Sequence, residues 1–179
     1  MMGFTFNNVH SSFFGVIMKS VDRSLLPGLR KNEFIIPGRH GAIDYGLNAY
    51  DKRVITVDCG FKASSIPDAR GKARDVSKWL SGSGLLVFDD EPDKAYQAKL
   101  YDAVSLEPQM RIGRFTLDFE CQPFAESLAY KQINTDITDN NEEVELTVAG
   151  TSETGCIITI KNNGNNTISG ITIRRKAAI

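Results

Sequence analysis

The stretch Phe115-Thr116-Leu117-Asp118-Phe119-Glu120-Cys121 alternates apolar and polar side chains without a break. Successive side chains of an extended chain point to opposite faces, so this stretch predicts a strand with one face in a core and one in water. Two other stretches show the same parity: Ile55, Val57, Cys59 and Phe61, and later Val144, Leu146 and Val148. The alternation indicates a mainly β fold.

One segment has a helical period instead. Its apolar residues recur at steps of three and four and form one stripe: Ala69, Ala73, Val76, Trp79 and Leu80. Ser65, Pro67 and Asp68 predict its start, and Gly82 and Gly84 predict its end. An interior glycine, Gly71, weakens the helix by roughly 1 kcal/mol relative to alanine. A helix this short is marginal alone, so we expect burial of Trp79 against a sheet to hold it.

A β-hairpin is predicted after the helix. Residues 85–88 and 94–101 provide its strands, and the acidic run Asp89-Asp90-Glu91-Pro92-Asp93 provides its turn. Proline and clustered acids suit a turn and are unfavourable inside a sheet.

The residue composition of the chain changes near residue 133. Residues 134–145 are polar and acidic and indicate a linker, followed by three short strand candidates at 144–148, 156–161 and 168–174. These strands are too few to close a sandwich, so either they complete a sheet elsewhere or the chain is a truncated form of something longer. We therefore expect a domain over residues 1–133, and a linker with a truncated or reduced β segment over residues 134–179.

Composition excludes several classes of protein. The 179 residues carry a net charge of -1 and no basic block, which argues against sequence-specific nucleic-acid binding. The apolar runs are too short for a membrane span, and we expect no signal peptide. Three cysteines without a close pair or metal spacing suit a reducing cytoplasm.

The candidates for nucleophilic chemistry are cysteines and histidines. Cys59, Cys121 and Cys156 share the parity of apolar neighbours, so we expect three small core residues and no reactive thiolates. His40, in the turn Gly38-Arg39-His40-Gly41, is a conceivable base, but no third partner is specified; His10 is the other histidine. A thiol hydrolase is therefore the last of our hypotheses.

Metal and phosphate sites are also not predicted. A calcium loop beginning at Asp89 needs glycine and glutamate where Lys94 and Leu100 stand, so we expect a solvated acidic turn. The run Gly82-Ser83-Gly84 follows a helix, whereas a phosphate-binding loop precedes one. We predict no catalytic, cofactor-binding or metal-binding residues, no cofactor, and no enzymatic activity.

Several stretches, taken in order, carry a resemblance to a known family. They are residues 4–12 (FTFNNVHSS), 36–41 (IPGRHG), 78–82 (KWLSG), 85–96 (LLVFDDEPDKAY), 98–100 (AKL) and 115–124 (FTLDFECQPF). Together they resemble the N-terminal domain of distal tail proteins of long-tailed phages infecting Gram-positive bacteria. The resemblance covers roughly residues 3–130, and the Trp79 helix followed by the acidic-proline turn is its most specific part.

The resemblance implies a β-sandwich-like domain with one helix that forms a hexameric ring. The ring would join the tail tube to the baseplate hub or tail fibre, in a virion tail whose parts are made in the bacterial cytoplasm. A galectin-like second domain usually follows and attaches baseplate or receptor-binding proteins. Residues 136–179 look like only its first strands, so attachment there is the weaker expectation.

Beside this hypothesis and the thiol hydrolase, two alternatives remain. The first is a tail-tube or tube-terminator subunit, which would also be rich in β structure and assemble into a ring. A carbohydrate-binding β-sandwich module would explain the strands, but such modules usually expose aromatic rings, whereas Trp79 lies on the apolar stripe of a helix.

Overall fold

The computed structural model describes residues 2–45, 49–102, 104–105, 107–109, 112–139, 143–146, 150, 152 and 155–174. The chain divides into two compact units, Met1–Asn134 and Thr135–Ile179. The first unit contains the helix and every strand assigned within the described residues.

The first unit is built on one antiparallel sheet in the order β2-β1-β7-β8-β10-β6-β3. β9 pairs with β10, and β11 pairs with β8. These strands are β1 (Phe4–Phe6), β2 (Val9–His10), β3 (Val16–Arg23), β6 (Arg53–Lys62), β7 (Ser83–Phe88), β8 (Lys94–Leu100), β9 (Glu107–Gln109), β10 (Ile112–Cys121) and β11 (Glu126–Ser127). A 3₁₀ turn, η1 (Ser11–Phe14), precedes β3.

The centre of the sheet is the β6–β10 ladder, which joins the two strands most clearly predicted from alternation. Their register sets Ile55 opposite Phe119 and Val57 opposite Leu117. The apolar parity of one strand therefore meets the apolar parity of the other on a single buried face. The mainly β prediction is confirmed here, as is the predicted hairpin, which β7 and β8 form.

The sheet curls back on itself. β1 and β10 are separated in the strand order by β7 and β8, a distance of roughly 14 Å in a flat sheet. Yet the ring of Phe6 lies 5.4 Å from that of Phe119, and the ring of Phe4 lies 5.9 Å from it, between centroids. The curl encloses an aromatic core between the two halves of the sheet, as in a β-sandwich.

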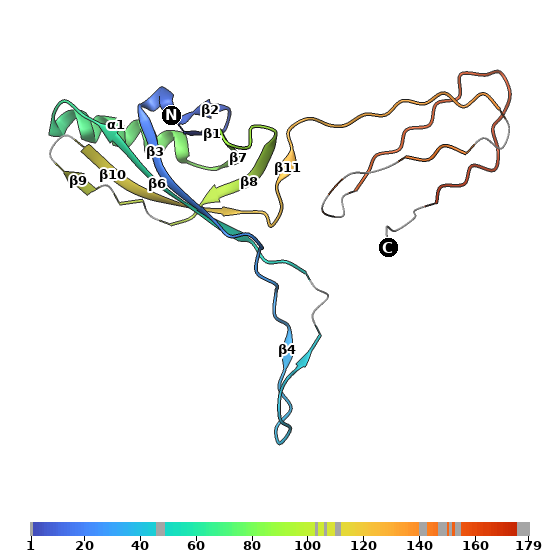
Figure 1. The fold of residues 1–179 in the computed structure, drawn as a ribbon, viewed down its shortest axis with the longest axis horizontal. Coiled ribbons are helices and arrows are strands. Elements are labelled where there is room, and N and C mark those ends of the chain that lie inside the picture. The colour runs from blue at the N-terminus through green and yellow to red at the C-terminus, as the bar shows by residue number, and fades with distance from the viewer. Residues whose placement is uncertain are drawn as a thin grey trace. The chain divides into compact units, whose positions relative to one another are not determined.

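α1 (Ile66–Leu80) covers this core (Figure 1). Ser65 caps it by accepting a hydrogen bond from the Asp68 amide, as its sequence predicts. The predicted stripe is buried apart from Ala73, which is partly buried. Gly82, with φ of 89°, follows the end of the helix. The assignment of Gly84 to the helix stop is wrong, because Gly84 lies in β7, where a Cβ would lie 1.6 Å from Asn7 Oδ1.

Trp79 fastens α1 to the sheet. Its indole Nε1–H donates a hydrogen bond to the Phe6 carbonyl oxygen at 2.9 Å, although β1 is otherwise paired through its backbone. Its ring stacks on Phe4 at 5.5 Å and on Phe14 at 4.9 Å between centroids. With its side chain 8% exposed, Trp79 docks the helix as the sequence predicts.

Between β3 and β6 the chain leaves the sheet and forms a long two-legged extension, which we call the arm (residues 24–52) (Figure 1). Near its end, β4 (Glu33–Phe34) pairs with β5 (Ile43–Asp44). Nearer the sheet, Leu29 bridges Tyr50. Backbone hydrogen bonds also join the legs, including Arg30 N–H to Ala49 O at 2.8 Å.

The second unit contains no strand among its described residues. The strands predicted at 156–161 and 168–174 are therefore wrong, as is the described part of 144–148; residues 147 and 148 lie outside the described chain. Alternation gives a segment the side chains of a strand, but a ladder also needs a neighbour's backbone. The second unit has a local turn at Asn162, with the Gly164 N–H donating to Asn162 Oδ1 at 2.9 Å.

Trp79→Ala should lower the free energy of unfolding by about 3–5 kcal/mol, because it removes a large buried ring from the core. Trp79→Phe keeps an aromatic ring but leaves the Phe6 carbonyl without its donor, at a cost of about 1–3 kcal/mol. Urea denaturation followed by far-ultraviolet circular dichroism measures both. Equal stability of the wild type and Trp79→Ala would contradict the docking role.

Gly71→Ala should raise the free energy of unfolding by about 0.5–1 kcal/mol. Gly71 lies inside α1, and a Cβ there meets no atom within 4 Å. The same denaturation measurement tests this change. Gly84→Ala is the matched control: it should destabilise the chain, since its Cβ would collide with Asn7.

Candidate assembly surfaces

The cysteines separate into two classes. Cys59 and Cys121 are buried, and desolvation raises the pKa of each thiol to about 12. The core assignment is confirmed for these two residues. It is wrong for Cys156, which is exposed because the strand predicted around it has no sheet to pack on.

The two histidines lie in different parts of the first unit. His40 is exposed in the bend at the end of the arm, and none of the hydrogen bonds described joins it to a cysteine. His10 Nδ1 contacts Ser12 Oγ at 2.7 Å, and His10 Nε2 lies 3.1 Å from Asp89 Oδ1. No local sequence pattern indicates this cluster, because its members lie in β2, in the 3₁₀ turn and in the turn of a distant hairpin.

The cluster has the residue types of a hydrolase triad, but its hydrogen bonds hold two segments of the chain together. The Ser12 amide N–H donates to His10 Nδ1 at 3.2 Å, so this nitrogen carries no proton and caps η1. Nε2–H is then the donor to Asp89, which also accepts the Gly3 N–H at 2.7 Å. The contacts join the N-terminal turn to the β7–β8 hairpin.

The acidic turn, residues 89–93, is exposed as predicted, but it is not simply solvated. Arg23, at the end of β3, pairs with Asp90 and with Glu91, the latter with Nη1 and Oε2 3.1 Å apart. The guanidinium carbon lies 4.8 Å above the centre of the Phe88 ring. The turn thus ties the hairpin to the opposite edge strand of the sheet.

The described ranges contain neither a cluster of metal ligands nor a membrane-spanning helix. Across those residues, no group of three or more His, Cys, Asp and Glu side chains is arranged to hold a metal ion. No described helix is long and apolar enough to cross a membrane.

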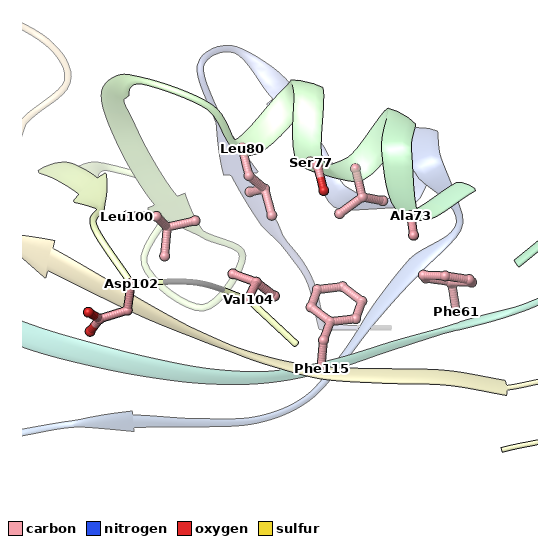
Figure 2. A pocket seen from close by; sticks show the side chains of 9 residues that line it. Phe61, Ala73, Ser77, Leu80, Leu100, Asp102, Val104 and Phe115 are labelled. Carbon is pink, nitrogen blue, oxygen red and sulfur yellow. The ribbon is translucent and has the colours of Figure 1, made fainter. Parts of the chain in front are cut away.

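A cavity of about 300 Å³ lies between α1 and β10 (Figure 2). Leu80, Phe61 and Phe115 are among its apolar walls. Asp102 stands at its margin, and its carboxylate points away from the apolar side chains (Figure 2). The lining offers an apolar space without converging polar groups, which does not suit catalysis.

The outer face of the central strands is polar and internally satisfied. Asp58 accepts hydrogen bonds from the hydroxyls of Ser20 and Thr116, both at 2.8 Å, and these bonds hold the pKa of Asp58 below its usual value. Thr56 donates to Asp118 in the same way, at 2.6 Å. This face therefore offers little unsatisfied surface to a partner.

The arm is the opposite case, since it exposes large apolar side chains. Among its described residues these are Leu25, Leu26, Leu29, Phe34, Ile35 and Tyr45. Leu25 is 100% exposed and Ile35 is 72% exposed. So many exposed large apolar side chains on one segment are typical of an interaction site.

A groove of about 880 Å³ lies between η1 and α1. Its apolar lining includes Val9, Phe14 and Trp79, and its charged lining comprises Lys72, Asp75 and Lys78. Phe13, at its margin, is 79% exposed. The groove combines an aromatic floor with a rim that is mainly basic.

Comparison with known proteins identifies the family. The profile of the phage tail protein RIFT-related domain matches residues 15–121, more than half of the chain. The chain belongs to this family of phage tail proteins. The match spans the arm, α1 and the β6–β10 ladder. A search of curated proteins found no significant match.

A solved structure supports the same fold. The Dit (gp 19.1) protein of phage SPP1 is described as a paradigm of the hub adsorption apparatus in phages that infect Gram-positive bacteria. Its structure matches 71% of this chain with a TM-score of 0.61 and 17% sequence identity. This chain covers 52% of that protein, about half its length. The likeness confirms the expected class of fold, mainly β with one helix and β-sandwich-like.

Neither the arm nor the groove was predicted as a surface. The turn-forming residues Leu26-Pro27-Gly28 and Pro37-Gly38 indicate breaks between strands, and they do not by themselves indicate an exposed arm. The sequence does contain a signal for an exposed segment. The apolar residues between Gly28 and Pro37 do not alternate with polar residues as those of the core strands do. The groove joins η1 to α1, which are far apart in sequence, and no local pattern could reveal it.

Thiol labelling should give one fast and two slow cysteines in the native protein. Cys156 is exposed, whereas Cys59 and Cys121 react only after the core opens. Raising the pH from about 7 to about 9 should leave the buried pair slow, because their pKa values of about 12 remain above that range. Ellman's reagent in buffer and in urea measures the two classes. Cys156→Ser should remove the fast phase alone, and a persistent fast phase would contradict the burial.

Proposed function

We propose that this phage tail protein is a ring subunit at the distal end of the tail, where a hexamer joins the tail tube to the baseplate hub. The apolar arm is the observation that carries the proposal. Membership of the tail-protein family and the likeness to Dit support it. The family and fold are those of structural tail proteins rather than of known enzymes.

The arm favours assembly because its apolar groups have no place in the folded core. Leu25 and Leu26 stand at its base, and Phe34 and Ile35 near its end, all exposed in the single chain. Covering them contributes roughly 25 cal/mol for each Å² of apolar surface removed from water. A neighbouring subunit provides that cover.

The shape of the arm also suits a head-to-tail ring. Each leg has roughly 14 residues and spans at most about 45 Å. An extension of one subunit that contacts a different surface on the next makes a heterologous interface, and such interfaces generate closed rings when the rotation closes. The body that carries the arm needs no active site for this role.

The domain division follows the same proposal. Residues 1–133 form the ring, and residues 134–179 serve as a linker and a segment that receptor-binding or baseplate proteins contact. Support comes from the exposed isoleucines of the second unit, among them Ile157, Ile160 and Ile173. Such alternating segments add readily to a neighbour's sheet. The protein would act in the virion tail after synthesis in the bacterial cytoplasm.

A carbohydrate-binding module is less well supported. The only tryptophan of the chain, Trp79, is buried against Phe4 and Phe14 and offers no exposed indole face to a sugar.

The oligomer should have a mass near six subunits, at least at high protein concentration, and electron micrographs should show a central hole. Size exclusion with light scattering gives the mass. A variant in which Asn-Gly replaces residues 30–49, joining Leu29 to Tyr50, should be monomeric, because these two residues are already bridged and the exposed groups beyond them are removed.

The shortened-arm variant should keep the thermal unfolding midpoint of the wild-type body, since none of the core residues lies in the arm. Tyr130→Ser is a matched control, because it removes a fully exposed ring outside the arm, and it should assemble normally. A wild type that is monomeric at every concentration would overturn the ring. A shortened variant that still forms the oligomer would overturn the role of the arm.

A further inference from the structure

We propose that Arg23 and Arg53 fix the direction of the arm in the free subunit by stacking on two aromatic rings of the β7–β8 hairpin. Both are positioning residues, because they act on the arm through the place where its legs leave the sheet. The inference concerns contacts within one chain. It rests on the proposed ring only for the use that a fixed direction serves.

The two arginines stand at the two ends of the arm. Arg23 is the last residue of β3, Arg53 is the first residue of β6, and the arm lies between them in sequence. Figure 1 shows both legs of the arm leaving the same end of the sheet. A side chain held at either position therefore restrains the chain where a leg begins.

Both arginines lie on the inner face of the sheet. In β6, Arg53 shares the parity of Ile55, which is fully buried. In the β3–β6 register Arg23 lies opposite Ile55, and directly opposed residues project from the same face. The two guanidinium groups therefore stand where the apolar core ends and the arm begins.

Each guanidinium lies over an aromatic ring of the hairpin. The guanidinium carbon of Arg23 is 4.8 Å from the centre of the Phe88 ring, and that of Arg53 is 5.8 Å from the centre of the Tyr96 ring. The two rings are buried and contact each other edge to face, with their centroids 6.4 Å apart. Because a cation is attracted to the face of an aromatic ring, one pair of rings holds both arginines.

Arg53 depends on its ring more than Arg23 does. Arg23 also pairs with Asp90 and Glu91 of the acidic turn. Arg53 takes part in none of the ion pairs described, and its buried Nε has no hydrogen-bond partner within the described part of the chain. A buried donor without an acceptor is unfavourable, and the contact with Tyr96 offsets that cost.

The second leg is also held where it meets β10. Lys52 Nζ lies 2.6 Å from Glu120 Oε2, and the ring of Tyr50 contacts that of Phe124 with 5.1 Å between centroids. Glu120 belongs to β10, and Phe124 follows the end of that strand. Together with the stacking of Arg53, these contacts restrain the leg before it extends away from the sheet.

A fixed direction serves the assembly of a ring. A heterologous ring closes only when every interface repeats the same rotation. An extension that is free to swing must also be ordered when it binds, and this ordering weakens association. An arm that already points in one direction in the free chain avoids that cost.

A distance measured within one chain tests the inference. In a Cys156→Ser background the remaining cysteines are buried, so spin labels attach to Glu33→Cys near the end of the arm and Arg74→Cys on α1, both at exposed positions. Labelled chain is diluted with an excess of unlabelled chain, and double electron–electron resonance gives the distance distribution. The distribution should have one narrow peak.

Removing the guanidinium groups should release the arm. In the double variant Arg23→Gln with Arg53→Gln, the distance distribution should broaden about twofold or more, because both ring contacts and the Arg23 ion pairs are lost. The dissociation constant of the oligomer should rise about tenfold or more, because the arm is then ordered during assembly. Arg114→Gln is the matched control, since Arg114 is exposed on β10, and it should leave the distribution narrow.

A single substitution covers the case in which the double variant fails to fold. Arg53→Lys keeps the positive charge but loses the planar group that stacks on a ring, so it should broaden the distribution by itself. Tyr96→Phe keeps the ring and should leave the distribution narrow. The thermal unfolding midpoint of each variant shows whether the body is folded. A broad distribution with the midpoint of the parent means that the direction of the arm is lost and the fold is not.

The outcomes separate this inference from the proposed ring. A broad distribution in either folded arginine variant supports the inference. A distribution that stays narrow in both variants, or that is already broad in the parent, overturns it and leaves the ring intact. A wild type that is monomeric at every concentration but has a narrow distribution overturns the ring and leaves this inference intact.

Discussion

The fold depends on the contact between one indole and one short strand. Trp79 donates its N–H to a carbonyl of β1 and lies between Phe4 and Phe14. The contact joins three segments distant in sequence: the N-terminal strand, the 3₁₀ turn and the end of α1. Without it, the helix would depend on the smaller buried contacts of Ala69, Val76 and Leu80 and on a marginal propensity that Gly71 reduces further. If α1 were displaced, the aromatic core inside the curled sheet would lose the helix that covers it.

Local periodicity predicted the parts of the fold that local chemistry determines. The parity of β6 and β10, the stripe of α1 and the β7–β8 hairpin all follow from side-chain spacing, because each element buries one face in the same core. The same reasoning failed at Cys156, where the alternation is present but no neighbouring strand is. It also misassigned Gly84, whose role is set by contact with Asn7 from another strand.

The surfaces were harder to predict than the core, for a physical reason. Three surface features join residues separated by long stretches of chain. They are the contact of His10 with Asp89, the pairing of Arg23 with the acidic turn, and the groove between η1 and α1. Such contacts leave no period in the sequence. The apolar residues of the arm likewise satisfy no pattern within the chain, which is consistent with a partner outside it. Polar side chains of the sheet hydrogen-bond to one another, whereas the apolar side chains of the arm are exposed to solvent.

Trp79 has one more consequence, because it is the only tryptophan of the chain. The indole N–H donates to the Phe6 carbonyl oxygen where α1 docks on the sheet, and the indole ring also lines the groove. The protein therefore has its single tryptophan fluorophore at the boundary between its core and its groove. Its emission spectrum records the integrity of the body, and its quenching and polarity record what enters the groove, without any attached label.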